Sequence, residues 1–160
     1  MYISFTHMEY FKYAVILFMF MGICDMLDGP IARKCKRTDE EKAFGVQIDS
    51  LVDVFSFVAY PIVLLYALGL DKWYNVIIFA IFAICGIARL AHFNIKSADK
   101  SKSVKFYEGL PVTSVACIYP LAFLLMLCIP RNIFLIIYSI LTLLIALLFV
   151  LRIKIPNQKE

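Results

Sequence analysis

Four carboxylates and an arginine are grouped in a short part of an otherwise apolar sequence. They form two runs, which read Asp25-Met-Leu-Asp28-Gly29-Pro-Ile-Ala32-Arg33 and Gly45-x-x-x-Asp49-x-x-x-Asp53. Ionisable residues in apolar segments are costly to bury and usually serve a function. The pattern therefore predicts a site of acidic chemistry in a membrane-embedded protein.

The spacing of the four acids indicates how they can meet. Asp25 and Asp28 are three residues apart, and Asp49 and Asp53 are four apart, so each pair shares one face of a helix. If the two helices are neighbours joined by a short loop, both faces converge and the carboxylates repel one another. Divalent cations relieve this repulsion, and hard oxygen ligands suit Mg²⁺ or Mn²⁺.

The residues between the acids indicate the substrate. Gly29 and Gly45 carry no side chain, so a ligand can approach the backbone closely. Arg33 offers a planar fork of donors that matches phosphate geometry. Metal ions, an arginine and small residues together predict a phosphate or diphosphate substrate.

The two runs resemble the signature of the CDP-alcohol phosphatidyltransferase family, D-x-x-D-G-x-x-A-R followed by G-x-x-x-D-x-x-x-D, at all eight fixed positions. One departure is visible, because eleven residues separate Arg33 from Gly45, where the family usually has about eight or nine. The extra residues fall in the polar stretch Lys34–Lys42, where we expect a loop that tolerates insertion.

The resemblance implies roles for the signature residues. It implies that Asp25, Asp28, Asp49 and Asp53 hold two divalent ions, Mg²⁺ or Mn²⁺, around a diphosphate. It also implies that Asp53 is the general base and that Arg33 contacts phosphate. The small residues Gly29, Ala32 and Gly45 would leave room for a cytidine nucleotide.

Three further stretches resemble the phosphatidylserine synthase branch of this family, namely residues 45–57, 88–94 and 107–113. This likeness implies transfer from CDP-diacylglycerol to L-serine. Arg89, in the second stretch, has two interpretations that stay open here. It binds the serine carboxylate or a substrate phosphate, or it pairs with a motif aspartate or extends to lipid headgroups.

The composition indicates a membrane protein, with 62% hydrophobic residues and a mean hydropathy of +0.84. The sequence predicts an all-α, polytopic membrane helix bundle that forms a single domain over residues 1–160. Its breaks leave five apolar segments long enough, or nearly so, to span a bilayer. They run approximately over Phe11–Ile31, Val46–Leu68, Trp73–Phe93, Leu110–Ile129 and Ile133–Leu151.

Basic residues predict the orientation. They gather in the Lys34–Lys42 stretch, near residues 96–105 and in the C-terminal tail. The positive-inside rule places these parts in the cytoplasm, so we expect a plasma-membrane protein whose acids face the cytoplasm.

The family resemblance implies six helices with the motif opening on the second. Here the motif opens on the first segment, so we expect a preceding helix to be missing.

Other functions stay open. Within the family, the acceptor could be glycerol 3-phosphate, an inositol phosphate or another alcohol, or the lipid donor could be archaeal. The acids could instead line a divalent-cation transporter, although this leaves the matched glycines, alanine and arginine without a reason. The chain could also be a non-catalytic fragment.

The expected partners are CDP-diacylglycerol, L-serine and the bilayer, with a homodimer as a further option and no nucleic acid. The five cysteines contain no C-x-x-C pair and indicate neither a zinc site nor a disulfide framework.

Overall fold

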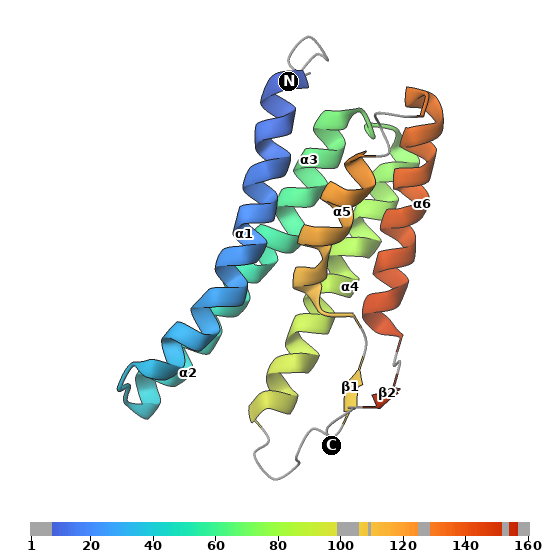
Figure 1. Ribbon diagram of the computed structural model, residues 1–160. Coiled ribbons are helices and arrows are strands. Elements are labelled where there is room, and N and C mark those ends of the chain that lie inside the picture. Colours follow the sequence, from blue (N-terminus) through green and yellow to red (C-terminus); the bar gives the residue numbers. More distant parts are fainter. Residues whose placement is uncertain (1–7, 99–105, 109, 125–128, 152–153, 157–160) are drawn as a thin grey trace.

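The structure is a computed structural model that describes residues 8–98, 106–108, 110–124, 129–151 and 154–156. These residues form a bundle of helices with one small strand pair at one end (Figure 1). The elements are, in chain order, α1 (Met8–Lys34), α2 (Asp39–Asp53), the π-helix η2 (Val54–Ala59), α3 (Tyr60–Leu68), α4 (Trp73–Ala98), β1 (Phe106–Glu108), the 3₁₀ helix η3 (Val112–Ser114), α5 (Val115–Leu124), α6 (Arg131–Val150) and β2 (Lys154–Pro156).

The predicted all-α membrane bundle is confirmed. Four helical stretches are long and apolar enough to cross a membrane, and they cover Phe11–Ala32, Asp39–Leu68, Trp73–Ile95 and Arg131–Val150. The strands β1 and β2, which the sequence did not predict, pair antiparallel, with Tyr107 opposite Ile155. They add only three residues each to a helical protein.

The fourth predicted span differs from Leu110–Ile129. The described helical part covers Val112–Leu124 and is shorter than the other four, while residues 125–128 lie outside the described residues. Pro111 sets the start, since it caps η3 in an extended conformation with φ −66° and ψ 143°. A proline lacks the N–H that would continue a helix in the N-terminal direction.

The prediction of a loop over Lys34–Lys42 was wrong in its second half. α2 already begins at Asp39, because Thr38 and Glu41 form a capping box. The Thr38 backbone N–H donates to Glu41 Oε2 at 2.7 Å, and the Glu41 backbone N–H donates to Thr38 Oγ1 at 3.3 Å. The connection between α1 and α2 is therefore only residues 35–38, which holds the two helices as an antiparallel pair.

The core lies between α1, the π-helix η2, α3, α4, α5 and α6, and it is mostly aromatic and aliphatic. Its fully buried side chains are Phe18, Phe57, Phe82, Phe134, Leu68, Leu70, Ile145, Val58, Val115, Thr142 and Pro61. α1 joins this core at Gly22, where a Cβ would lie 2.6 Å from the Cβ of Ala116 on α5. The absence of a side chain at this glycine lets α1 and α5 approach closely.

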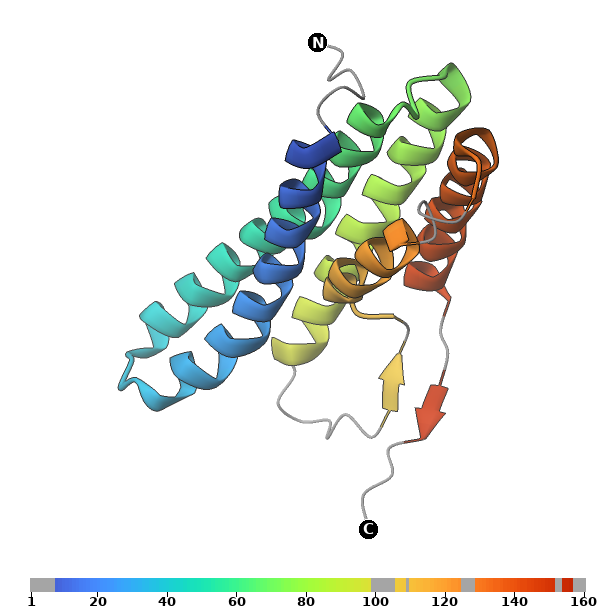
Figure 2. The same cartoon turned by 45° about the horizontal axis from the view of Figure 1, so that its top comes forward.

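The α1–α2 pair extends beyond the core. Figures 1 and 2 both show the last turns of α1 and all of α2 side by side at one end of the molecule. No residue of α2 is buried. The same end carries the C-terminal ends of α4 and α6 and the strand pair (Figure 1). The basic residues in 99–105, 152–153 and 157–160 lie outside the described residues, so the orientation stays a prediction.

A π-helix interrupts the long helix that runs from Asp39 to Leu68. Its wider turn is closed by the backbone N–H of Tyr60, which donates to the carbonyl of Phe55, five residues back. Ser56, Phe57 and Val58 within it are buried against the bundle. The π-helix therefore joins an apolar segment that is anchored in the core to α2, which carries the acids outside it.

Candidate functional site

Three of the four predicted carboxylates converge between α1 and α2. One oxygen each from Asp25, Asp28 and Asp49 lies within 4.8 Å of the others. Two unit charges at this separation repel by about 3 kcal/mol at an effective dielectric constant near 20. The convergence expected from the residue spacing is confirmed, and the cluster has the hard oxygen donors that a divalent cation requires.

Asp53 completes the group at the end of α2, directly before the π-helix. Its carboxyl lies close to that of Asp25. Its Oδ1 atom is buried and has no hydrogen-bond partner among the described residues. A buried oxygen without a partner costs free energy, and a bound cation removes that cost. The residues therefore fit Mg²⁺ or Mn²⁺, which would be held by Asp25, Asp28, Asp49 and Asp53.

A cavity of about 550 Å³ opens beside the acids. Its wall is made of both helices and of the turn that joins them, and consists of Asp28, Gly29, Ala32, Arg37, Lys42, Gly45, Val46, Ile48, Asp49 and Val52. A Cβ on Gly29 would meet none of the described side chains within 4 Å. The missing side chain at this position therefore widens a space that is already open, rather than relieving a contact in the protein.

Arg37 belongs to the cavity wall, although the sequence singled it out only as one of several basic residues. Its Nη2 atom donates to the carbonyl oxygen of Ala32 at 2.6 Å. Its Nη1 atom would lie 3.3 Å from a Cβ on Gly45. The half-buried Arg37 side chain thus folds back from the α1–α2 connection over two of the predicted nucleotide positions.

A hydrogen bond joins two of the stretches that resemble the serine branch. Asn94 on α4 donates from Nδ2 to Ser50 Oγ on α2 at 2.6 Å, and Ser50 Oγ donates to the Val46 carbonyl at 2.9 Å. Ser50 follows Asp49 directly. The bond therefore fixes α2 against α4 beside the acidic cluster, which no single stretch of the sequence could reveal.

Arg89 and Arg33 differ in what the structure shows of them. Arg89 on α4 donates from Nε to the carbonyl of Leu110 at 3.1 Å, which ties it to the segment before η3. This contact tests neither interpretation of its function. Arg33 lies in the last turn of α1. Its side chain is not among those that the structure describes, so its contact with phosphate stays a prediction.

Comparison with known proteins decides the family. A sequence profile of the CDP-alcohol phosphatidyltransferase family matches residues 1–152. The chain belongs to this family. CDP-alcohol phosphatidyltransferases generally use divalent metal ions, and the acidic cluster between α1 and α2 is compatible with that requirement. With its apolar helices, this CDP-alcohol phosphatidyltransferase chain is a multi-pass membrane protein.

Its curated relatives act on serine by name. A CDP-diacylglycerol–serine O-phosphatidyltransferase of Methanocaldococcus jannaschii is 39% identical over 135 residues, which are 84% of this chain and 59% of the relative. A yeast (Saccharomyces cerevisiae) protein of the same name is 37% identical over 66% of this chain and 40% of its own length. An archaetidylserine synthase of Methanothermobacter thermautotrophicus is 36% identical over 64% and 42%. The chain thus spans about half the length of these relatives.

Proposed function

We propose that this chain transfers the phosphatidyl group of CDP-diacylglycerol to L-serine, forming phosphatidylserine and releasing CMP. The observation that carries the proposal is the convergence of Asp25, Asp28 and Asp49, with Asp53 against Asp25, beside a cavity walled by small residues. Relatives that are named for serine transfer support the choice of acceptor.

The cavity wall suits a nucleotide diphosphate. The four acids would hold two divalent ions, which when bound neutralise the diphosphate and the departing CMP. Gly29, Ala32 and Gly45 leave space for the nucleotide, and an added Cβ on Gly29 would meet none of the described side chains within 4 Å. Arg33, at the end of α1, is the proposed phosphate contact because a guanidinium can donate two parallel hydrogen bonds to one phosphate.

Asp53 is the proposed general base. It accepts the proton of the serine hydroxyl while the serine oxygen forms a bond to the phosphorus that carries the diacylglycerol. The bond between this phosphorus and the oxygen that joins it to CMP breaks in the same displacement. Asp53 suits this role because it lies deeper in the bundle than Asp49, next to the buried residues of the π-helix. No covalent intermediate on the protein is required.

Arg89 is the proposed contact for the serine carboxylate. Its hydrogen bond to the Leu110 carbonyl fixes the guanidinium where α4 meets the segment before η3. A fixed guanidinium offers a carboxylate a prepared pair of donors. We further propose that the acids face the cytoplasm at the plasma membrane, because the α1–α2 connection and β2 lie at the same end of the bundle (Figure 1) and the sequence around both is basic.

The test is CMP release by the purified chain in detergent with CDP-diacylglycerol and Mg²⁺ or Mn²⁺. We expect release with serine and none with glycerol 3-phosphate, and we expect EDTA to abolish it. Asp39→Asn is the matched control, because Asp39 is an exposed carboxylate whose ion pair with Lys42 has little effect on stability. Equal release with glycerol 3-phosphate, or release that EDTA does not change, would contradict the proposal.

The lipid part of the donor has a second candidate. One relative is named for archaetidylserine synthesis, and the nucleotide and the acceptor in this candidate are the same. We therefore propose an archaeal lipid donor as the alternative. The same assay with the archaeal CDP-lipid in place of CDP-diacylglycerol compares the two, and the donor with the larger kcat/KM is the substrate.

A further inference from the structure

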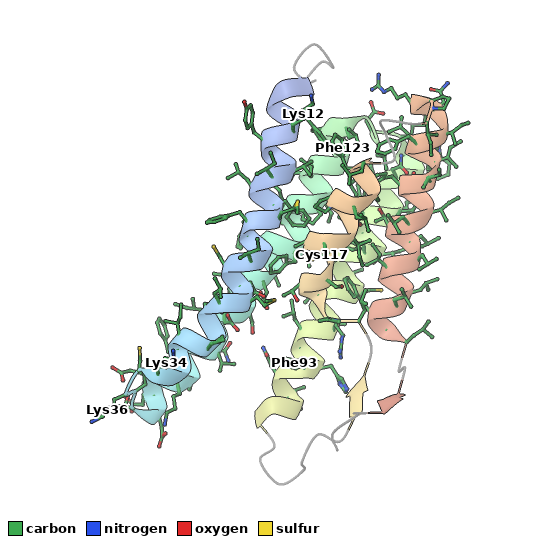
Figure 3. All side chains as sticks on the ribbon, in the orientation of Figure 1. Lys12, Lys34, Lys36, Phe93, Cys117 and Phe123 are labelled. Carbon is green, nitrogen blue, oxygen red and sulfur yellow. The ribbon has the colours of Figure 1, made fainter. Side chains whose placement is uncertain are left out.

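The α1–α2 connection carries a residue that the signature does not contain. Eleven residues separate Arg33 from Gly45, about two or three more than the family usually has. Arg37 lies in this longer segment. Its side chain reaches back to Ala32 and Gly45, whereas Lys34 and Lys36 lie at the outer tip of the helix pair (Figure 3). The insertion has therefore placed one guanidinium against the cavity.

Charge is divided along the cavity wall. Asp28 and Asp49 line one part, and Arg37 and Lys42 line another. Gly45 is four residues before Asp49 on α2, which corresponds to a rise of about 6 Å along the helix. The Lys42 ammonium already pairs with Asp39 at 2.9 Å. Of the two cations in the described cavity wall, Arg37 is therefore the better placed to act within the cavity, about one helical turn away from the acids.

A nucleotide has the same division of chemistry. Its phosphates belong with the acids, where divalent ions would hold them, and its base lies beyond the ribose, away from the phosphates. The positions between the two ends are the small residues Gly29, Ala32 and Gly45. Cytosine presents a ring nitrogen and a carbonyl oxygen as neighbouring acceptors on one edge, and a guanidinium presents neighbouring N–H donors in a plane.

We propose that Arg37 binds the cytosine base of the nucleotide by donating to these two acceptors. The inference rests on the proposed function for the identity of the nucleotide, and it adds a contact that the eight signature positions do not include. The hydrogen bond from Nη2 to the Ala32 carbonyl holds the guanidinium plane in place before the ligand arrives. Prior positioning of this kind lowers the entropy lost on binding.

The competing explanation is that Arg37 only caps the end of α1. The Ala32 carbonyl is in the last turn of α1, where carbonyls lack a partner four residues on, and it also accepts from the Cys35 backbone N–H at 3.4 Å. Two substitutions separate the explanations. Arg37→Ala removes both the cap and the fork. Arg37→Lys keeps a cation that can donate to the Ala32 carbonyl but loses the planar pair of donors. Lys36→Ala is the matched control, since Lys36 is an exposed cation one residue away that is absent from the cavity wall.

The experiment measures binding of CMP and of inorganic pyrophosphate to each variant of the 160-residue chain by calorimetry in detergent with Mg²⁺. Thermal unfolding of each variant is recorded in parallel. We expect Arg37→Ala to weaken CMP binding at least tenfold, because loss of even one of the two hydrogen bonds with a charged donor corresponds to about tenfold. Arg37→Lys should weaken it severalfold with an unchanged unfolding midpoint. Pyrophosphate binding should stay within about twofold in all variants, and Lys36→Ala should bind both probes as the wild type does.

Three results would overturn the inference. CMP binding that Arg37→Ala leaves unchanged would show that the guanidinium does not contact the nucleotide. Equal weakening for CMP and pyrophosphate would assign Arg37 to the phosphates instead of the base. Wild-type CMP binding by Arg37→Lys would reduce the residue to a helix cap. A wild-type chain that binds neither probe would refute the proposed function as well, whereas failure with serine alone would leave the Arg37 inference standing.

Discussion

Substituting Gly22 by alanine should loosen the contact on which the position of α1 depends. The added Cβ would lie 2.6 Å from the Cβ of Ala116. Carbon atoms in contact prefer about 3.5–4.0 Å, so α1 and α5 must separate by about 1 Å. Overpacking of this kind costs about 1–3 kcal/mol of stability.

The same displacement reaches the acids. Gly22 precedes Asp25 by three residues, just under one turn of α1. Asp25 would then shift relative to Asp49, which stays with α2 and α4 through the Ser50–Asn94 hydrogen bond. A misplacement of about 1 Å in a catalytic group can lower the rate by up to about 10²-fold. We therefore expect loss of both stability and turnover from one methyl group.

The assay is the thermal unfolding midpoint in detergent, together with the rate of CMP release. Ala116→Gly in the same chain removes the opposing Cβ, so the double variant should recover much of both losses. Ala116→Gly alone should cost about 1 kcal/mol from helix propensity. Gly29→Ala is a second control for stability alone. Among the described side chains, none lies within 4 Å of an added Cβ there, so the unfolding midpoint should not fall.

Two results would refute this reasoning. Gly22→Ala with a wild-type unfolding midpoint would show that α1 and α5 do not press on each other at this point. Additive losses in the double variant would show that the effect of Gly22→Ala does not arise from Ala116, because residues in contact should be coupled.

Two further predictions concern the acids and their support. Asp53→Asn should abolish CMP release but spare much of the CMP binding. Asp49→Asn should lower CMP release and also weaken Mn²⁺ binding. Wild-type-like turnover of the Asp53→Asn variant would show that Asp53 is not the general base. Asn94→Ala should cost about 1 kcal/mol of stability and lower turnover, because α2 loses its hydrogen bond to α4. Ser50→Ala should cause the same loss of stability and turnover, and the Ser50→Ala/Asn94→Ala double variant should lose no more than either single variant. Calorimetry measures the binding of CMP and Mn²⁺, and thermal unfolding measures the stability.

The sequence was sufficient to predict the convergence of the acids because helical spacing acts locally. Residues three or four apart share a face whatever surrounds them, so Asp25 with Asp28 and Asp49 with Asp53 needed only the assumption of two neighbouring helices. The start of α2 was also readable, since Thr38 and Glu41 form the capping-box pattern, but the surrounding charged residues led us to predict a loop.

Contacts between distant segments were not accessible in this way. The Asn94–Ser50 bond depends on how α4 packs against α2, and the Arg37 position depends on the path of the chain after α1. The π-helix gives no signal in the apolar sequence of residues 54–59, because a wider turn replaces ordinary helical bonds without requiring a special residue.

That π-helix also restricts which changes in chain length the protein can tolerate. Each residue of an α-helix turns the chain by about 100°. Deleting one residue from 54–59 would let the segment return to α-helical winding, and the resulting helix would still be apolar and long enough to cross a membrane. The wide turns of the π-helix close five residues back, so α-helical winding with one residue fewer turns the chain through nearly the same total angle. With Phe57 and Val58 held in the core, α2 would keep its orientation and Asp49 would stay beside α1. A deletion at 50–52 has no wide turn to absorb it, so it would rotate Asp49 by about 100° relative to the core.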